Sequence, residues 1–249
     1  MVKKERYYLL DSIRAITLIS MLSYHFCVDL QMFGMINWLY STPSVIWQKS
    51  ICITFIFLSG LCFQMGKHKI RRGIIVFSCG VAISLFTYIF MRDIFISFGI
   101  LSFMGFAMLI TTPLDLLFKK IKFNHWVGFF LFLTLFVVTF NMWKGSVLFG
   151  LVKMPDFLYK NVFTAYLGFP YASFFSSDYF PIFPWIFLYL TGYFAYMILK
   201  RYNLLRFLTK PRCKPLEFVG RHTLWFYMAH QPIIYGITYS LYLLLFSSK

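Results

Sequence analysis

The chain has 249 residues, of which 60% are hydrophobic, 22% are aromatic and only 13% are charged. This composition excludes an ordinary soluble globular protein and indicates an integral membrane protein. A formal net charge of +16 would suggest nucleic-acid binding in a soluble protein. Here the basic residues lie between apolar segments, so we expect a lipid bilayer and no nucleic acid as partner.

Seven apolar segments are long enough to cross about 30 Å of hydrocarbon as helices. They cover residues 8–30, 46–65, 73–91, 98–118, 126–142, 181–199 and 223–246. The first is too long, and too interrupted by Asp11 and Arg14, for a cleaved signal peptide. The short connections at 66–72 and 119–125 predict antiparallel hairpins. We therefore predict an all-α, polytopic transmembrane bundle that forms one domain over residues 1–249.

The first segment carries ionisable side chains on one stripe. At about 100° per residue, the step from Arg14 to His25 returns to within about 20° of the same direction. Asp11 and Asp29 fall about 60° from Arg14. A charge in hydrocarbon costs roughly 3 kcal/mol or more, so these residues are expected to face a cavity or a partner. Asp29 can hold one ring nitrogen of His25 and leave the other as a base. A purely structural polar contact is equally open.

Two polar residues are expected near the outer surface. Ser102 lies about one turn into the fourth segment, and Asp178 lies just before the sixth. Asp178 is near the end of the longest connection, residues 143–180, which is rich in Phe and Tyr. We interpret it as an interfacial or re-entrant lid. Its aromatic residues are either a belt at the bilayer surface or a stacking surface for a sugar-like or lipid-linked acceptor.

The last segment contains His230 and Gln231 directly before Pro232. Proline removes a backbone donor and usually kinks a helix. This point is about 12 Å along the helix from Thr223, which predicts a depth closer to the inner side than that of His25. His230 is either a packed core histidine or part of a substrate path.

Basic residues are distributed unevenly between the two faces. With the N-terminus inside, the inner set is Lys3, Lys4, Arg6, Lys67, Lys69, Arg71, Arg72, Lys119, Lys120, Lys122, Lys200, Arg201, Arg206, Lys210, Arg212, Lys214 and Arg221. The outer set is Lys49, Arg92, Lys144, Lys153, Lys160 and Lys249. This excess predicts an inner N-terminus and an outer C-terminus. The inner residues either only set topology and touch anionic headgroups, or also attract a polyanionic cytosolic cofactor.

Cysteine and histidine patterns indicate neither a disulfide framework nor a metal site. The cysteines are Cys27, Cys52, Cys62, Cys79 and Cys213, which have no metal-ligand spacing. We interpret them as packing residues. The five histidines are expected at different depths, so we expect no metal.

Six motifs occur in order along nearly the whole chain: Asp11-Ser-Ile-Arg14, His25-Phe-Cys-Val-Asp29-Leu, Phe55-Ile-Phe-Leu-Ser-Gly60, Phe98-Gly-Ile-Leu101, Asp178-Tyr-Phe-Pro-Ile-Phe-Pro-Trp185 and Gly220-Arg-His-Thr-Leu-Trp-Phe-Tyr-Met-Ala-His230-Gln-Pro232. Together they resemble the bacterial heparan-alpha-glucosaminide N-acetyltransferase catalytic-domain family. The first and last are the most specific. The spacing of Arg14 and His25 also resembles the pattern of acyltransferase family three.

The resemblance implies transfer of an acyl group from cytosolic acyl-CoA to an acceptor on the outer side. Arg14 and His25 would be the signature pair, Asp29 and Asp178 acceptor-side carboxylates, and His230 a residue that lines the path. The chain departs from the pattern at Ser102, where many bacterial members have histidine. That departure implies an altered mechanism or an inactive enzyme if the histidine is needed.

We therefore expect an acyl-CoA-dependent transferase of a bacterial cytoplasmic membrane, with acetyl-CoA or another acyl-CoA as co-substrate and no metal. The acceptor would be a cell-envelope glycan or lipid-linked sugar, and an oligomer is possible. Arg14 and Arg221 would hold the CoA phosphates, and His25, oriented by Asp29, would be the general base. The substrate path would comprise Ser102, Asp178, His230 and Gln231. The alternatives are a transporter or flippase that uses the same polar stripe, and a catalytically degenerate scaffold.

Overall fold

The computed structural model describes residues 7–39, 41–210 and 213–246. Its α-helices are α1 (Tyr8–Met32), α2 (Thr42–Cys62), α3 (Lys69–Phe90), α4 (Ile100–Lys120), α5 (His125–Thr139), α6 (Val162–Leu167), α7 (Ile182–Arg201), α8 (Lys214–Arg221) and α9 (Thr223–Phe246). Short 3₁₀ turns are η1 (Phe63–Met65), η2 (Arg92–Ile94), η3 (Met142–Lys144), η4 (Leu148–Gly150), η5 (Asp156–Leu158) and η6 (Leu204–Leu208). Lys3, Lys4, Arg6, Arg212 and Lys249 lie outside the described residues.

Six helical stretches in the described chain are long and apolar enough to cross a membrane. They are Tyr8–Met32, Thr42–Met65, Lys69–Phe90, Ile100–Lys120, His125–Lys144 and Ile182–Arg201. They correspond to the first six predicted segments, so the all-α, polytopic membrane architecture is confirmed. The seventh segment also folds as a helix, α9, with 24 residues. It is not among the six because its tyrosines, His230 and Gln231 reduce its mean hydropathy.

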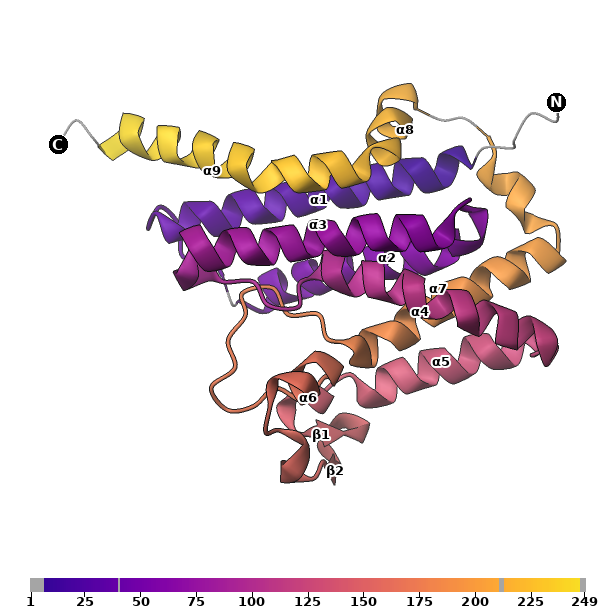
Figure 1. Ribbon diagram of the computed structural model, residues 1–249. Coiled ribbons are helices and arrows are strands. Elements are labelled where there is room, and N and C mark those ends of the chain that lie inside the picture. The colour runs from indigo at the N-terminus through magenta and orange to yellow at the C-terminus, as the bar shows by residue number, and fades with distance from the viewer. Residues whose placement is uncertain (1–6, 40, 211–212, 247–249) are drawn as a thin grey trace. The chain divides into compact units, whose positions relative to one another are not determined.

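The chain divides into two compact units. We call Met1–Phe55 with Asn203–Lys249 the terminal unit, and Ile56–Tyr202 the central unit. In the terminal unit α1 packs against α8 and α9, and α9 runs beside α1 in Figure 1. The contact with α8 is through the backbone, because a Cβ atom on Gly220 would lie 1.8 Å from the Asp11 carbonyl oxygen.

The central unit contains two helix pairs, α3 with α4 and α5 with α7, visible in Figure 1. The first pair is close because small residues face the neighbouring backbone. A Cβ atom on Gly105 would lie 2.3 Å from the Phe77 nitrogen, and one on Gly80 would lie 2.4 Å from Ser102. In the second pair, a Cβ atom on Gly128 would lie 2.6 Å from the Phe194 ring.

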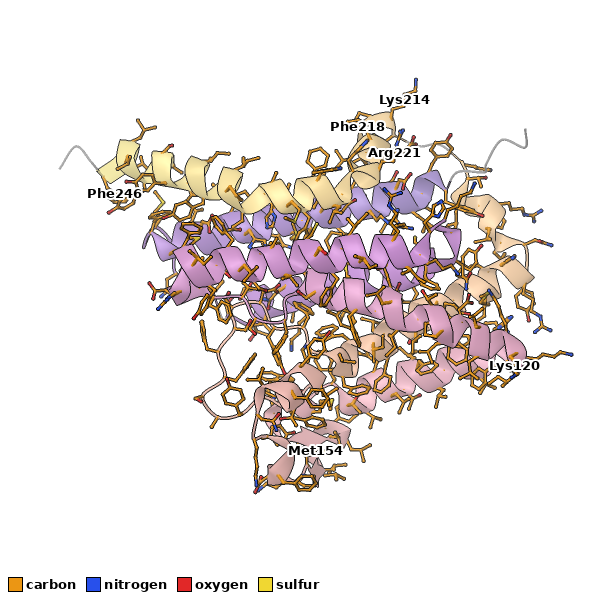
Figure 2. The ribbon with its side chains drawn as sticks, viewed as in Figure 1. Lys120, Met154, Lys214, Phe218, Arg221 and Phe246 are labelled. Atoms are coloured by element: carbon orange, nitrogen blue, oxygen red, sulfur yellow. The ribbon has the colours of Figure 1, made fainter. Side chains whose placement is uncertain are left out.

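The connection between α5 and α7 is ordered but contains no long helix. It includes the antiparallel strands β1 (Ser146–Val147) and β2 (Val152–Lys153), which pair Ser146 with Lys153. Met154, labelled in Figure 2, directly follows β2. The end of the connection is attached to the loop before α4, because the Phe180 amide donates to the Phe98 carbonyl oxygen at 2.8 Å. Of the five cysteines, Cys62 is buried and the other four are partly buried.

Candidate functional site

Helices α1 and α9 bring His25 and His230 into contact. Their ring centroids are 4.8 Å apart and the rings are inclined by 58°. The depth predicted for His230 was therefore wrong. The estimate took Thr223 as level with the start of α1, but α8 packs there, at Asp11. Helix α9 consequently begins further along α1, and His230 lies beside His25.

Asp29 and Gln231 form a second contact between the same helices. The Gln231 Nε2 donates to Asp29 Oδ1 at 3.0 Å. Asp29 is fully buried, and its Oδ2 has no hydrogen-bond partner within the described residues. The predicted hydrogen bond from His25 to Asp29 is therefore not formed in this structure. The carboxylate is held by Gln231 instead, because α9 places an amide donor directly against it.

Backbone geometry sets the tautomer of His230. Its Nδ1 is hydrogen-bonded to the carbonyl oxygen of Tyr227, one turn earlier on α9. A carbonyl oxygen can only accept, so Nδ1 carries a proton. In the neutral ring the lone pair is then on Nε2, which is buried and has no partner among the described residues. A fixed tautomer with an available lone pair is what a general base requires.

Three buried acceptor atoms of the terminal unit have no described partner: Asp29 Oδ2, His230 Nε2 and Gln231 Oε1. The Gln231 amide nitrogen is already used by Asp29, so only its oxygen remains. Buried polar atoms normally find partners, and an unsatisfied one costs about 1–3 kcal/mol. These groups can accept but not donate, which favours a ligand that brings hydroxyl or amine hydrogens.

Aromatic side chains lie next to the histidines. Tyr24 makes an edge contact with His25, with ring centroids 6.1 Å apart, and also contacts Trp38 and Trp47. Trp47 is fixed by a hydrogen bond from Nε1 to Ser20 Oγ at 2.7 Å. The sequence left the aromatic residues of 143–180 as either a bilayer belt or an acceptor surface, and it did not point to this cluster. The two tryptophans around the start of the second apolar segment were the available signal.

Arg14 and Arg221, predicted to bind cofactor, also belong to the terminal unit. Arg14 is paired with Asp11, with Nη1 and Oδ1 3.2 Å apart. Arg221 is exposed near the end of α8, and its Nε donates to the Glu217 carbonyl oxygen at 3.4 Å. Figure 2 shows Lys214, Phe218 and Arg221 on this short helix. Only Arg221 of the predicted cofactor pair is on an exposed surface, whereas Arg14 already has an internal carboxylate.

Ser102 and Asp178 belong to the central unit, at the beginning of α4. The Ile100 amide donates to Asp178 Oδ2 at 3.1 Å, so Asp178 joins the end of the 143–180 connection to α4. Desolvation raises the pKa of Asp178 to about 6, although the Ile100 hydrogen bond opposes this shift. Ser102 is buried against Gly80 of α3. In this structure Ser102 therefore packs against α3, and Asp178 links the 143–180 connection to α4.

The central unit contains an ion cluster that sequence reasoning missed. Asp115 is buried on α4 and pairs with Lys69 at 3.2 Å and Lys119 at 2.8 Å. It also accepts hydrogen bonds from Tyr193 Oη, at 2.6 Å, and from Gln64. The signal was a single carboxylate inside the fourth apolar segment, four residues before Lys119. Within the described ranges, no three His, Cys, Asp or Glu side chains gather as a metal site.

The model of the family described as "Heparan-alpha-glucosaminide N-acetyltransferase, catalytic" matches residues 6–232. The chain therefore belongs to this family, which confirms the family suggested by its motifs. The matched range includes His25, Asp29, His230 and Gln231. No curated protein and no solved structure matches the chain. Family membership and the apolar helices together indicate a membrane protein of the acetyltransferase type.

Proposed function

We propose that this member of the heparan-alpha-glucosaminide N-acetyltransferase catalytic family moves an acyl group, acetyl in the simplest case, from cytosolic acyl-CoA to a cell-envelope glycan or lipid-linked sugar. The observation that carries the proposal is the histidine pair. His230 has a tautomer fixed by Tyr227, a buried Nε2 without a described partner, and the His25 ring against it.

The proposed reaction is direct transfer. A hydroxyl or amine of the acceptor attacks the thioester carbonyl carbon, and the new bond to carbon forms while the bond from carbon to sulfur breaks. The acceptor proton passes to the histidine pair, with His230 Nε2 as the position whose lone pair is fixed. His25 is the second ring that can hold this proton. The departing CoA thiolate takes the proton, which restores the neutral pair.

The acceptor's hydroxyl or amine hydrogens match the unpaired acceptors of the site. Asp29 Oδ2 and Gln231 Oε1 would receive them and orient the reacting atom. Tyr24, Trp38 and Trp47 would pack against the apolar face of a sugar ring. Asp29 thus has a different proposed role from that expected at first: it positions the acceptor rather than the base, because its carboxylate contacts Gln231.

The donor is proposed to approach from the face that carries most basic residues, by the positive-inside rule. Arg221 is an exposed cation on that face and can attract CoA phosphates. Arg14 is already paired with Asp11, so its guanidinium would have to be shared between Asp11 and a CoA phosphate. Ser102 and Asp178 are proposed to hold the beginning of α4 within the central unit rather than to act in the chemistry.

The test is purified protein with radiolabelled acetyl-CoA and an envelope extract. A labelled glycan or lipid-linked sugar supports the proposal, and its formation should fall in His230→Gln. His222→Gln is the matched control, since His222 bonds the Phe218 carbonyl and is outside the pair. Uptake of label without covalent transfer would indicate a transporter instead. No transfer to any extract component by folded protein would indicate a degenerate scaffold.

A further inference from the structure

A pocket in the central unit is separate from the histidine pair. It has a volume of about 390 Å³ and lies where the end of α4, the beginning of α5 and the end of α7 meet. Lys120, labelled in Figure 2, marks this end of α4. The pocket walls are largely aromatic, with Phe118, Phe123 and Tyr193 among them.

The charged side chains that line this pocket are all cationic. Lys119, Lys122 and Arg201 line it, and none of its lining residues is acidic. Lys119 shares Asp115 with Lys69, so the cluster keeps an excess positive charge. Lys122 and Arg201 have no ion-pair partner in the described part of the chain. These two cations are therefore available for an anion.

His125 also lines the pocket. The Nδ1 atom of His125 is buried and has no hydrogen-bond partner within the described ranges. The backbone amides of Trp126 and Val127, at the beginning of α5, donate to the Asn124 side chain. These amides are therefore not available to a ligand. A ligand oxygen that accepts from both Lys122 and Arg201 would form charge-assisted hydrogen bonds in this pocket.

The neighbouring surface indicates the depth of the pocket in the membrane. Trp126 Nε1 donates to Tyr202 Oη at 3.3 Å, and such Trp and Tyr residues concentrate at the level of lipid headgroups. An apolar groove then follows α5 from Trp126 to Thr134. Its members Val127 and Phe130 are 54% and 57% exposed. The cationic pocket includes the first residue of α5, and the exposed apolar groove begins at the next residue of the same helix.

We infer that this pocket binds the phosphate headgroup of an anionic phospholipid, with an acyl chain along the α5 groove. The cations match the phosphate oxygens, and the groove from Trp126 matches the acyl chain. A free nucleotide phosphate fits the cations equally well but would leave the groove without an occupant. Charge complementarity and headgroup depth therefore favour the lipid.

The test uses full-length, delipidated protein in detergent, titrated with phosphatidylglycerol and followed by native mass spectrometry. Phosphatidylglycerol should bind at least tenfold more tightly than phosphatidylcholine, since about 1 kcal/mol per basic residue at a membrane surface gives roughly thirtyfold for two cations. Lys122→Gln with Arg201→Gln should remove that preference. Lys120→Gln is the matched control, because Lys120 is an exposed cation of the same helix end that does not line the pocket.

Two further arms distinguish the lipid from other phosphates. Glycerophosphoglycerol, which has the headgroup without chains, should compete at least tenfold less well than the lipid. Phe130→Ala should weaken phosphatidylglycerol binding and leave that of the headgroup unchanged. Equal binding of both lipids, an equal loss in Lys120→Gln, or displacement of the lipid by 3′,5′-adenosine diphosphate at lower concentration than by glycerophosphoglycerol would overturn the inference.

Discussion

Gln231 of α9 donates a hydrogen bond to the fully buried Asp29 of α1, with 3.0 Å between Nε2 and Oδ1. This bond leaves one carboxylate oxygen and one amide oxygen without described partners. Together with the nearby His25 and His230 contact, it defines how α1 and α9 pair. The polar residues of two distant segments therefore meet at one level of the terminal unit.

Replacing Gln231 with Leu should destabilise the folded protein by about 1–3 kcal/mol, because Asp29 would lose its donor while it remains buried. Replacing both residues with Leu should cost less than the two single changes added together, since no unpaired polar group would remain. Thermal unfolding in detergent measures all three variants. Additive losses would mean that the two side chains do not interact in the folded protein.

The sequence predicted the helices well and their partners poorly. Long apolar runs determine where spans occur, so α1 and α4 begin within two residues of the predicted segments. Which helices pair depends on side-chain contacts between distant segments, such as Asp29 with Gln231. The depth of His230, counted by helical rise from Thr223, was wrong because the unexpected short helix α8 packs against the start of α1. The Asp115 cluster was missed because it also depends on a contact between distant segments, that of Asp115 with Lys69.

Asp178 should make stability depend on pH. Burial raises its pKa to about 6 in the folded protein, whereas an unfolded chain has a value near 3.9. The folded state therefore binds more protons than the unfolded state between about pH 4 and pH 6. The stabilisation that protonated Asp178 gives the folded state is fully present below about pH 4 and is lost as the pH rises through about 6. Asp178→Asn keeps an oxygen for the Ile100 amide and should remove this part of the pH profile, measured as the difference in Tm between the two proteins.

Ser102→His should destabilise this chain rather than restore a family pattern. Ser102 is buried, and its backbone and Oγ lie against Gly80 with no room even for a methyl group there. Overpacking of this kind typically costs about 1–3 kcal/mol. Ser102→Ala should remain close to wild type in Tm. A Ser102→His variant of unchanged stability and higher transfer activity would instead identify the natural protein as a degenerate enzyme.

Topology depends on whether α9 crosses the membrane. The positive-inside rule predicts that a reporter inserted at residues 119–122 is inside and that one fused after Lys249 is outside. This arrangement needs α9 as a seventh span beyond the six more apolar helices. Accessibility of each reporter to an impermeant reagent in intact cells is the measurement. Two reporters on the same face would leave α9 on the inner side and would reverse the direction from which the histidine pair is reached.

The histidine pair gives the most direct test of chemistry. His230→Gln keeps polarity and approximate volume but cannot accept and return a proton, so acyl transfer should fall by about 10²- to 10⁴-fold, while CoA binding stays near normal. His25→Gln should reduce transfer at least about tenfold, because its ring lies against His230 and shares the proton in the proposed step. His222→Gln should leave transfer unchanged. The order of the two losses assigns the base, since a larger loss in His25→Gln would transfer that role to His25. Near wild-type turnover in both variants would remove the pair from the mechanism, and the fixed tautomer of His230 would then be a packing feature of α9.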